Sequence, residues 1–202
     1  MKINLKLTLM MSALSLFAVC AVGLTLLSQT RADISSLSHD KAVAMADDNS
    51  GDVLNFLTTY WVITETLVDV IDQIDNVIED NRRPYLNNIL RGVLELHNEI
   101  VGIWCIWEKD ALEGDDLKYL GIPGTTEDGR FSPYWIRKGS NITMYPLTDF
   151  EEPVTGDYYQ LPKRNNYTMI HDPFIYNVGG KETLITTIAA PIHKIGSHNV
   201  LG

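Results

Sequence analysis

Carboxylates are the most concentrated chemistry-bearing side chains in this sequence. Five of them fall in one short segment, which could in principle hold a calcium ion: Glu108, Asp110, Glu113, Asp115 and Asp116. Their spacing lacks the regular ligand pattern of a calcium loop, so we predict a solvated acidic loop instead. The second acidic segment, Asp149 to Glu152, is predicted to be a solvated loop as well.

Catalytic signatures are absent from the sequence. It contains no glycine-rich phosphate loop, no GxSxG and no HExxH, and its five histidines are scattered without an i, i+4 pair that could face a metal. We therefore predict that the protein is not an enzyme and uses no metal or cofactor.

Aromatic residues gather in the second half of the chain, most densely in the stretch GRFSPYW, residues Gly129–Trp135. Strand alternation places Tyr134 and Trp135 on opposite faces, so at most one of them points toward any one site. One interpretation is ordinary core packing. The other is an aromatic box for a small organic ligand, with nearby carboxylates selecting its charge. The residues themselves leave both interpretations open.

Helices are predicted in the first half of the chain, ahead of the aromatic residues. Apolar residues recur at steps of three and four over residues 32–80 and predict a long amphipathic helix, with Leu54, Leu57, Trp61, Leu67, Ile71, Ile74 and Ile78 along one side. Pro84 interrupts this pattern. A shorter helix is predicted from Tyr85 to Asn98.

From residue 99 the pattern changes to strands and turns. A buried strand is predicted over residues 99–107, followed by a long loop over 110–129 and further strands over 131–138, 142–147, 168–176 and 183–192. Residues 156–162 are predicted to form a short helix or turn. The adjacent glycines at 179 and 180 predict a hairpin turn. Two helices followed by an antiparallel meander indicate an α+β fold.

An uncharged run of 21 residues, Leu7–Leu27, is long enough to cross a membrane as a helix. We predict an uncleaved anchor, with a cleaved signal peptide as the alternative, and Lys2 and Lys6 favour a cytoplasmic N-terminus.

The remaining chain, residues 32–202, holds all 26 acidic residues and only 13 of the 16 basic ones. This acidic balance argues against a nucleic-acid partner. Cys105 is predicted to be a small core residue.

Several short segments, in this order, resemble the double Cache sensor module of bacterial methyl-accepting chemotaxis proteins. They are Trp104 and Trp107, Ala111–Asp115 (ALEGD), Gly129–Arg137 (GRFSPYWIR), Asp157–Lys163 (DYYQLPK), Asp172–Lys181 (DPFIYNVGGK) and Leu184–Ile192 (LITTIAAPI). The resemblance covers residues 32–202 and implies an extracytoplasmic sensor for a small solute at the inner membrane. The apolar stripe of the long helix indicates a homodimer formed through that helix. The resemblance also implies that ligand binding shifts helices and does no chemistry.

The domain organisation expected from this resemblance is a cytoplasmic start and anchor over residues 1–31, a stalk helix and second helix over 32–98, and a membrane-distal, PAS-like Cache lobe over 99–202. The lobe would end before its sheet is complete, and the chain would lack its signalling output. A histidine kinase or a cyclic-dinucleotide enzyme is the alternative output. A membrane-tethered structural or adaptor protein without a ligand is the competing interpretation of another class.

Two positions depart from the members of the family that bind amino acids. Ser132 stands where those proteins carry an arginine, and Tyr176 stands where they carry an aspartate. A different small molecule is therefore expected, and Asp149 or Asp172 would favour a cationic amine. The predicted ligand-binding residues are Arg130, Tyr134, Trp135, Asp149, Asp172 and Tyr176.

Overall fold

A computed structural model describes residues 41, 45, 49–194, 196–197 and 199–202. The chain divides into two compact units, Met1–Leu57 and Thr58–Gly202. In the first unit, residues 49–57 are helical. The predicted anchor, Leu7–Leu27, lies outside the described residues. Within the described part of the chain, no helix combines the length and the apolar character that crossing a membrane requires.

The second unit begins with helical residues 58–71, as predicted. The predicted helix does not continue regularly to residue 80, because two short 3-10 segments follow: η1 (Asp72–Asn76) and η2 (Glu79–Asn81). Ile71 and Ile74 are buried, but Ile78 is 73% exposed. The prediction for Ile78 was wrong because the tighter 3-10 turns and the extended Val77 rotate it away from the helical stripe.

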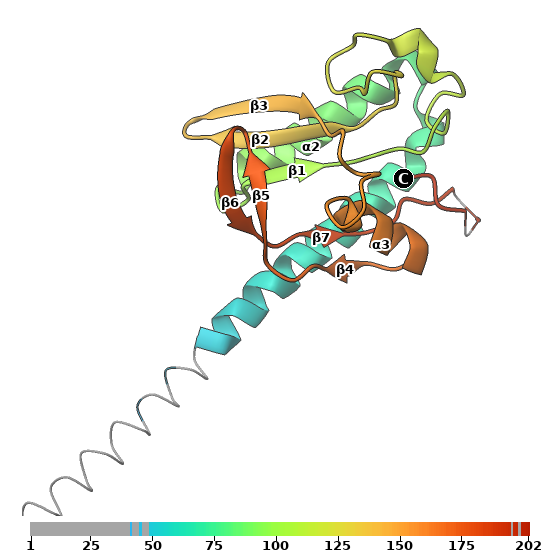
Figure 1. Cartoon of the computed structure of the whole chain (residues 1–202). Helices are drawn as coiled ribbons and strands as arrows, with labels where there is room; N and C mark the ends of the chain where they lie inside the picture. The colour runs from blue at the N-terminus through green and yellow to red at the C-terminus, as the bar shows by residue number, and fades with distance from the viewer. Residues whose placement is uncertain (1–40, 42–44, 46–48, 195, 198) are drawn as a thin grey trace, which may run out of the picture. The chain divides into compact units, whose positions relative to one another are not determined.

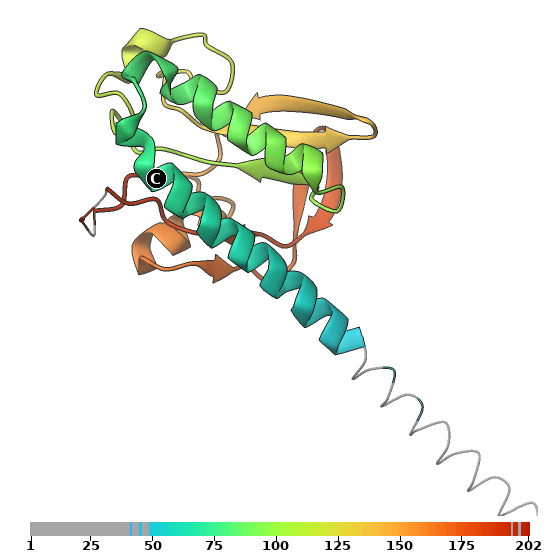
Figure 2. The same cartoon turned by 180° about the vertical axis from the view of Figure 1, so that it is seen from behind.

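Helix α2 (Arg82–Leu96) starts earlier than predicted and contains Pro84 in its first turn. Proline is tolerated there because the first N–H groups of a helix have no partner within the helix. Leu86, Leu90 and Leu94 form its buried side, in agreement with the predicted apolar face. Figures 1 and 2 show α2 lying along one face of the three-stranded sheet.

The strands are antiparallel but do not form the single meander that the sequence predicted. A three-stranded sheet has the order β1 (Gly102–Trp104), β2 (Pro133–Lys138) and β3 (Asn141–Pro146), while β4 (Met169–Ile170) pairs with β7 (Ile188–Ala189) and β5 (Phe174–Val178) pairs with β6 (Lys181–Ile185). The strand predicted over 168–176 is interrupted at residues 171–173. Pro173 has no N–H to continue a ladder.

The loops and turns lie where the sequence predicted them. Residues 110–129 form a loop that contains only one regular element, η3 (Asp116–Tyr119). The β5–β6 hairpin turns at Gly179 and Gly180, whose φ angles of 60° and 92° are those that glycine adopts readily. Helix α3 (Asp157–Asn165) ends at Asn166 in the left-handed conformation.

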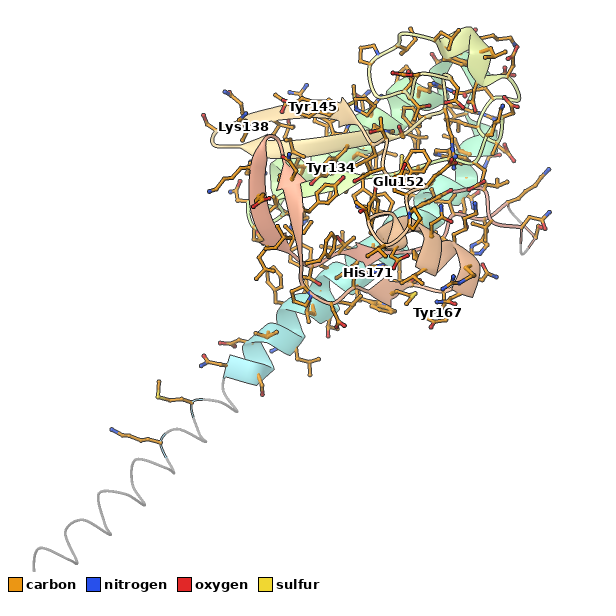
Figure 3. All side chains as sticks on the ribbon, in the orientation of Figure 1. Tyr134, Lys138, Tyr145, Glu152, Tyr167 and His171 are labelled. Atoms are coloured by element: carbon orange, nitrogen blue, oxygen red, sulfur yellow. The ribbon has the colours of Figure 1, made fainter. Side chains whose placement is uncertain are left out.

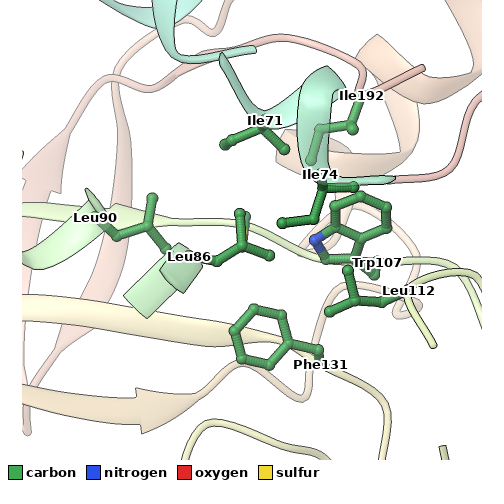
Figure 4. Packing of buried hydrophobic residues seen from close by; sticks show 9 residues of the cluster. Ile71, Ile74, Leu86, Leu90, Trp107, Leu112, Phe131 and Ile192 are labelled. Carbon is green, nitrogen blue, oxygen red and sulfur yellow. The ribbon is translucent and has the colours of Figure 1, made fainter. Parts of the chain in front are cut away.

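Strand alternation divides the core into two clusters on opposite faces of the sheet. Ile103, Cys105 and Trp107 pack in the first cluster, whereas Trp104 and Ile106 pack in the second. The first cluster also contains Ile71, Ile74, Leu86, Leu90, Leu112, Phe131 and Ile192 (Figure 4). The apolar run at 103–107 is continuous because both faces of this segment are covered.

Cys105 is a free, buried thiol, as predicted for a core residue. Burial raises its pKa to about 12, so it stays protonated and packs as a small apolar side chain.

Candidate ligand-binding site

The second cluster is built around the carboxylate of Asp149. The phenol of Tyr158, in α3, donates a hydrogen bond to Asp149 Oδ1 over 2.7 Å, and the phenol of Tyr176, in β5, donates to the same oxygen over 3.1 Å. The other carboxylate oxygen, Oδ2, has no hydrogen bond to the described residues. The prediction of a solvated loop was therefore wrong for Asp149, which is half-buried.

Aromatic rings surround this carboxylate in a series of edge-to-face contacts, and we call these rings and Asp149 together the Asp149 cluster. Tyr176 lies 6.3 Å from Tyr134, 6.0 Å from Tyr158 and 6.0 Å from Phe174, measured between ring centroids. Trp104 lies 5.2 Å from Tyr158. These rings come from β1, β2, α3 and β5, which the fold brings together on the sheet face opposite α2 (Figure 1).

Tyr134 differs from the other two tyrosines of the cluster. It is 8% exposed, and its ring lies over the backbone of Gly102, where an added Cβ would stand 2.6 Å from the ring. Its hydroxyl makes no hydrogen bond within the described part of the chain. Figure 3 shows Tyr134 on the side of β2 that faces β5, with Lys138 at the far end of the β2–β3 hairpin.

Burial keeps the phenols of this cluster neutral. It raises the pKa of Tyr134 to about 12, with the negative charge of Asp149 adding to the effect. It also raises the pKa of Tyr158 and of Tyr176, again with Asp149 adding to the effect. At neutral pH all three phenols are therefore protonated and can act as hydrogen-bond donors.

Arg130, one of the predicted site residues, serves a neighbouring cluster instead. Its guanidinium contacts Glu151 over 2.7 Å, the Tyr159 hydroxyl over 3.0 Å and Glu108 over 3.2 Å, and it also donates to the carbonyl of Trp107. Arg130 is 6% exposed and lies over the ring of Phe150. Its hydrogen bonds therefore brace the loop against α3.

Trp135 and Asp172 are not brought to the Asp149 cluster. The indole of Trp135 packs against the first core cluster and donates a hydrogen bond to Asn87 Oδ1 over 3.0 Å. Asp172 is exposed. Ser132 is fully buried, and its hydroxyl donates to the carbonyl of Leu147 over 3.0 Å. Of the six predicted residues, the fold thus assembles Tyr134, Asp149 and Tyr176.

The sequence predicted that the carboxylates at 108–116 form a solvated loop. This prediction was wrong for two of them. Glu113 and Asp116 are buried and form ion pairs with the guanidinium of Arg83, at 2.9 Å and 3.0 Å. Arg83 also donates to the carbonyl of Gly129 over 2.9 Å. Among the described residues, no group of three or more possible ligands could hold a metal ion.

Trp104, Tyr158 and Phe174 belong to the Asp149 cluster but were not predicted as site residues. The sequence places Trp104 and Tyr158 among the concentrated aromatics, and it places Phe174 beside Pro173. Nothing in its spacing indicates that Tyr158, in a short helix, meets Asp149 across the turn at residues 150–156. Only the packing of α3 against the sheet brings these residues together.

The fold is similar to that of extracellular sensor domains, and the sequence is similar to that of a chemotaxis receptor. The chain is similar to the methyl-accepting chemotaxis protein TlpQ of Pseudomonas aeruginosa, with 28% identity over 126 residues that cover 56% of this chain and 18% of that protein. No family model matches the chain.

Solved structures of sensor domains share this fold. The extracellular domain of the histidine kinase mmHK1S-Z3 aligns with a TM-score of 0.62 and 25% identity, covering 72% of this chain and 49% of that one. The structure of methyl-accepting chemotaxis protein X aligns with a TM-score of 0.70 and 23% identity, covering 84% of this chain and 61% of that one. These findings confirm the predicted resemblance to chemoreceptor sensor modules. The chain spans less than a fifth of its curated relative and between about half and three fifths of these solved domains.

Proposed function

We propose that this chain is the extracytoplasmic sensor region of a methyl-accepting chemotaxis receptor and that it binds a small organic cation at Asp149. The observation that carries the proposal is a half-buried carboxylate that has aromatic rings around it and whose Oδ2 has no hydrogen bond within the described part of the chain. Among the described residues, no lysine or arginine forms an ion pair with this carboxylate. A ligand that brings a positive charge would supply the missing partner.

The aromatic rings favour the same class of ligand. The face of a tyrosine or tryptophan ring attracts a cation through its quadrupole, and this attraction strengthens where water is excluded. Tyr134 is buried and Trp104 is partly buried, so both can contribute apolar contact as well. The free hydroxyl of Tyr134 can donate to a polar atom elsewhere in the ligand.

The placement in the cell is part of the proposal. Leu7–Leu27 would anchor the chain in the inner membrane with residues 32–202 outside the cytoplasm, and the helix that follows the anchor would pair with a second copy. A bound solute would then act by changing the relative populations of two helix arrangements, and the downstream part of the receptor would carry the signal.

Thermal unfolding of the full chain, purified in detergent, tests the ligand class. Matched compounds that share a ring but differ in charge should be compared at pH 7, such as benzylamine, benzyl alcohol and benzoate, alongside a panel of aliphatic amines. We expect at least one amine to raise the melting temperature, because a ligand that binds only the folded state stabilises it. Neutral and anionic counterparts should have no effect.

Asp149→Asn should weaken the binding of that amine at least about tenfold, because it removes a charge-assisted hydrogen bond. Glu152→Gln is the matched control, since Glu152 is an exposed carboxylate of the same loop, and it should leave the binding unchanged. Stabilisation by an anion or a neutral compound instead would refute the ligand class. No stabilisation by any compound, in a sample shown to be folded, would refute sensing by this chain.

A further inference from the structure

Helix α3 connects the Asp149 cluster to the first helix of the second unit, residues 58–71. At its N-terminal end, Tyr158 donates to Asp149 Oδ1 over 2.7 Å. The adjacent Tyr159 donates to Glu108 and is contacted by Arg130, so the same turn of α3 is fixed on two sides. The position of this turn is therefore set by Asp149 on one side and by Glu108 and Arg130 on the other.

The other end of α3 leads directly to the first helix. Asn166 ends α3, and two residues later the buried hydroxyl of Thr168 donates a hydrogen bond to Glu65. A second connection runs through His193, whose ring nitrogen Nε2 lies 2.6 Å from Asn166 Oδ1 and whose backbone N–H donates to Asp72 over 3.0 Å. Two sets of hydrogen bonds thus join the C-terminal end of α3 to the helix of residues 58–71, at Glu65, and to the start of η1, at Asp72.

A short helix transmits displacement well, because its backbone hydrogen bonds make it stiffer than the loops around it. A cationic group that bonds to Asp149 Oδ2 would reposition the carboxylate, whose Oδ1 accepts from the Tyr158 phenol, and with it the turn of α3 that carries Tyr158. That movement would reach Thr168, because the intervening segment contains only the last turns of α3, the left-handed Asn166 and Tyr167.

We infer that Thr168 and Glu65 are positioning residues for the Asp149 site: their hydrogen bond couples α3, and through it Tyr158, to the long helix. The inference rests on the proposed function only in treating Asp149 as a ligand site. Coupling between two sites is reciprocal, so the helix would also set the position of Tyr158. The hydrogen bond between Thr168 and Glu65 would therefore change ligand affinity although neither residue contacts the ligand.

A double-mutant cycle on the full chain tests this coupling without any ligand. Tyr158→Phe and Glu65→Leu would each be made alone and together, and the unfolding equilibrium constant measured in urea. Substitutions at independent sites combine to within about twofold in that constant. We expect the double variant to differ from the product of the single effects by about threefold or more.

Thr66→Val is the matched control, because Thr66 neighbours Glu65 and, among the residues that the structure describes, its hydroxyl bonds only to the carbonyl of Val62 in the same helix, over 2.7 Å. Combined with Tyr158→Phe, it should show independent effects. Independent effects for the Glu65 pair, or equal coupling for the Thr66 pair, would each overturn the inference. Because no ligand is added, failure of the cycle is distinguishable from failure of the proposed amine binding.

Discussion

The two faces of the β1–β2–β3 sheet use the same strands for different purposes. On the α2 face, leucines, isoleucines and aromatic rings fill the space, and the buried charges of Arg83, Glu113 and Asp116 are paired with one another. On the opposite face, Asp149 Oδ2 and the Tyr134 hydroxyl have no hydrogen bond to the residues that the structure describes. The first face is built for stability and the second leaves polar groups available for a ligand.

This difference follows from how polar groups behave when water is removed. A buried charge without a partner is costly, so the α2 face tolerates Arg83 only with two carboxylates and a carbonyl around it. A partly open carboxylate such as Asp149 is tolerated because it retains some contact with water. Replacing that water by a cationic ligand would improve its environment. The expected effects of substitution differ accordingly between the two faces.

The largest effect is expected for Arg83→Leu on the α2 side. This change leaves Glu113 and Asp116 buried without their cation and should lower the free energy of unfolding by about 3–5 kcal/mol. Arg91→Leu is the control, because the Arg91–Glu95 pair is exposed and such pairs contribute less than about 1 kcal/mol. Urea unfolding measures both, and equal losses would contradict the distinction between buried and exposed pairs.

A smaller effect is expected from single hydroxyl deletions on the opposite face. Tyr176→Phe removes a hydrogen bond to a carboxylate and should cost about 1–2 kcal/mol. Tyr134→Phe removes a hydroxyl that has no partner in the described part of the chain, and should change stability by less than about 0.5 kcal/mol. A large loss for Tyr134→Phe would show that its hydroxyl serves the fold and is not free for a ligand.

The smallest effect on stability is expected when the pH is lowered and His171 becomes protonated. Burial lowers the pKa of His171, so the folded state favours its neutral form more than the unfolded state does. The resulting stabilisation is present above the ordinary histidine pKa of 6.5 and is lost as the pH falls through the lowered pKa of the folded state. His171 precedes β5, so the loss of stability would affect the strand that carries Tyr176.

Urea unfolding at pH 7 and pH 5 measures this effect. His171→Asn should lose less stability than the unsubstituted chain over that interval, because asparagine at this position cannot take up a proton. An equal loss in both proteins would show that His171 does not contribute.

The elements with strong local signals were predicted well from the sequence. The apolar face of α2 is confirmed at Leu86, Leu90 and Leu94, and the glycine pair of the β5–β6 turn has the expected positive φ angles. Predictions that depended on continuity were less accurate. The strand over 168–176 is interrupted, and the long helical stripe ends before Ile78, because 3-10 turns change the spacing.

The predicted site was assembled only in part for a similar reason. Alternation within β2 separates Tyr134 from Trp135, and the structure shows that Tyr134 is the one on the Asp149 face. No local pattern distinguishes Asp149 from the exposed Asp172, since both lie in short polar segments. Their difference comes from α3, whose Tyr158 reaches Asp149.

The sequence by itself determined the class of fold, the two-faced character of the central strands and the resemblance to chemoreceptor sensor modules, because helix periodicity, strand alternation and short motifs are all local. Only the tertiary structure decided which carboxylates are free. It buries Glu113 and Asp116 against Arg83, and it places Asp149 among rings from four separate elements. Burial and charge pairing depend on contacts between distant segments, and these contacts convert an ordinary acidic loop into a candidate binding site.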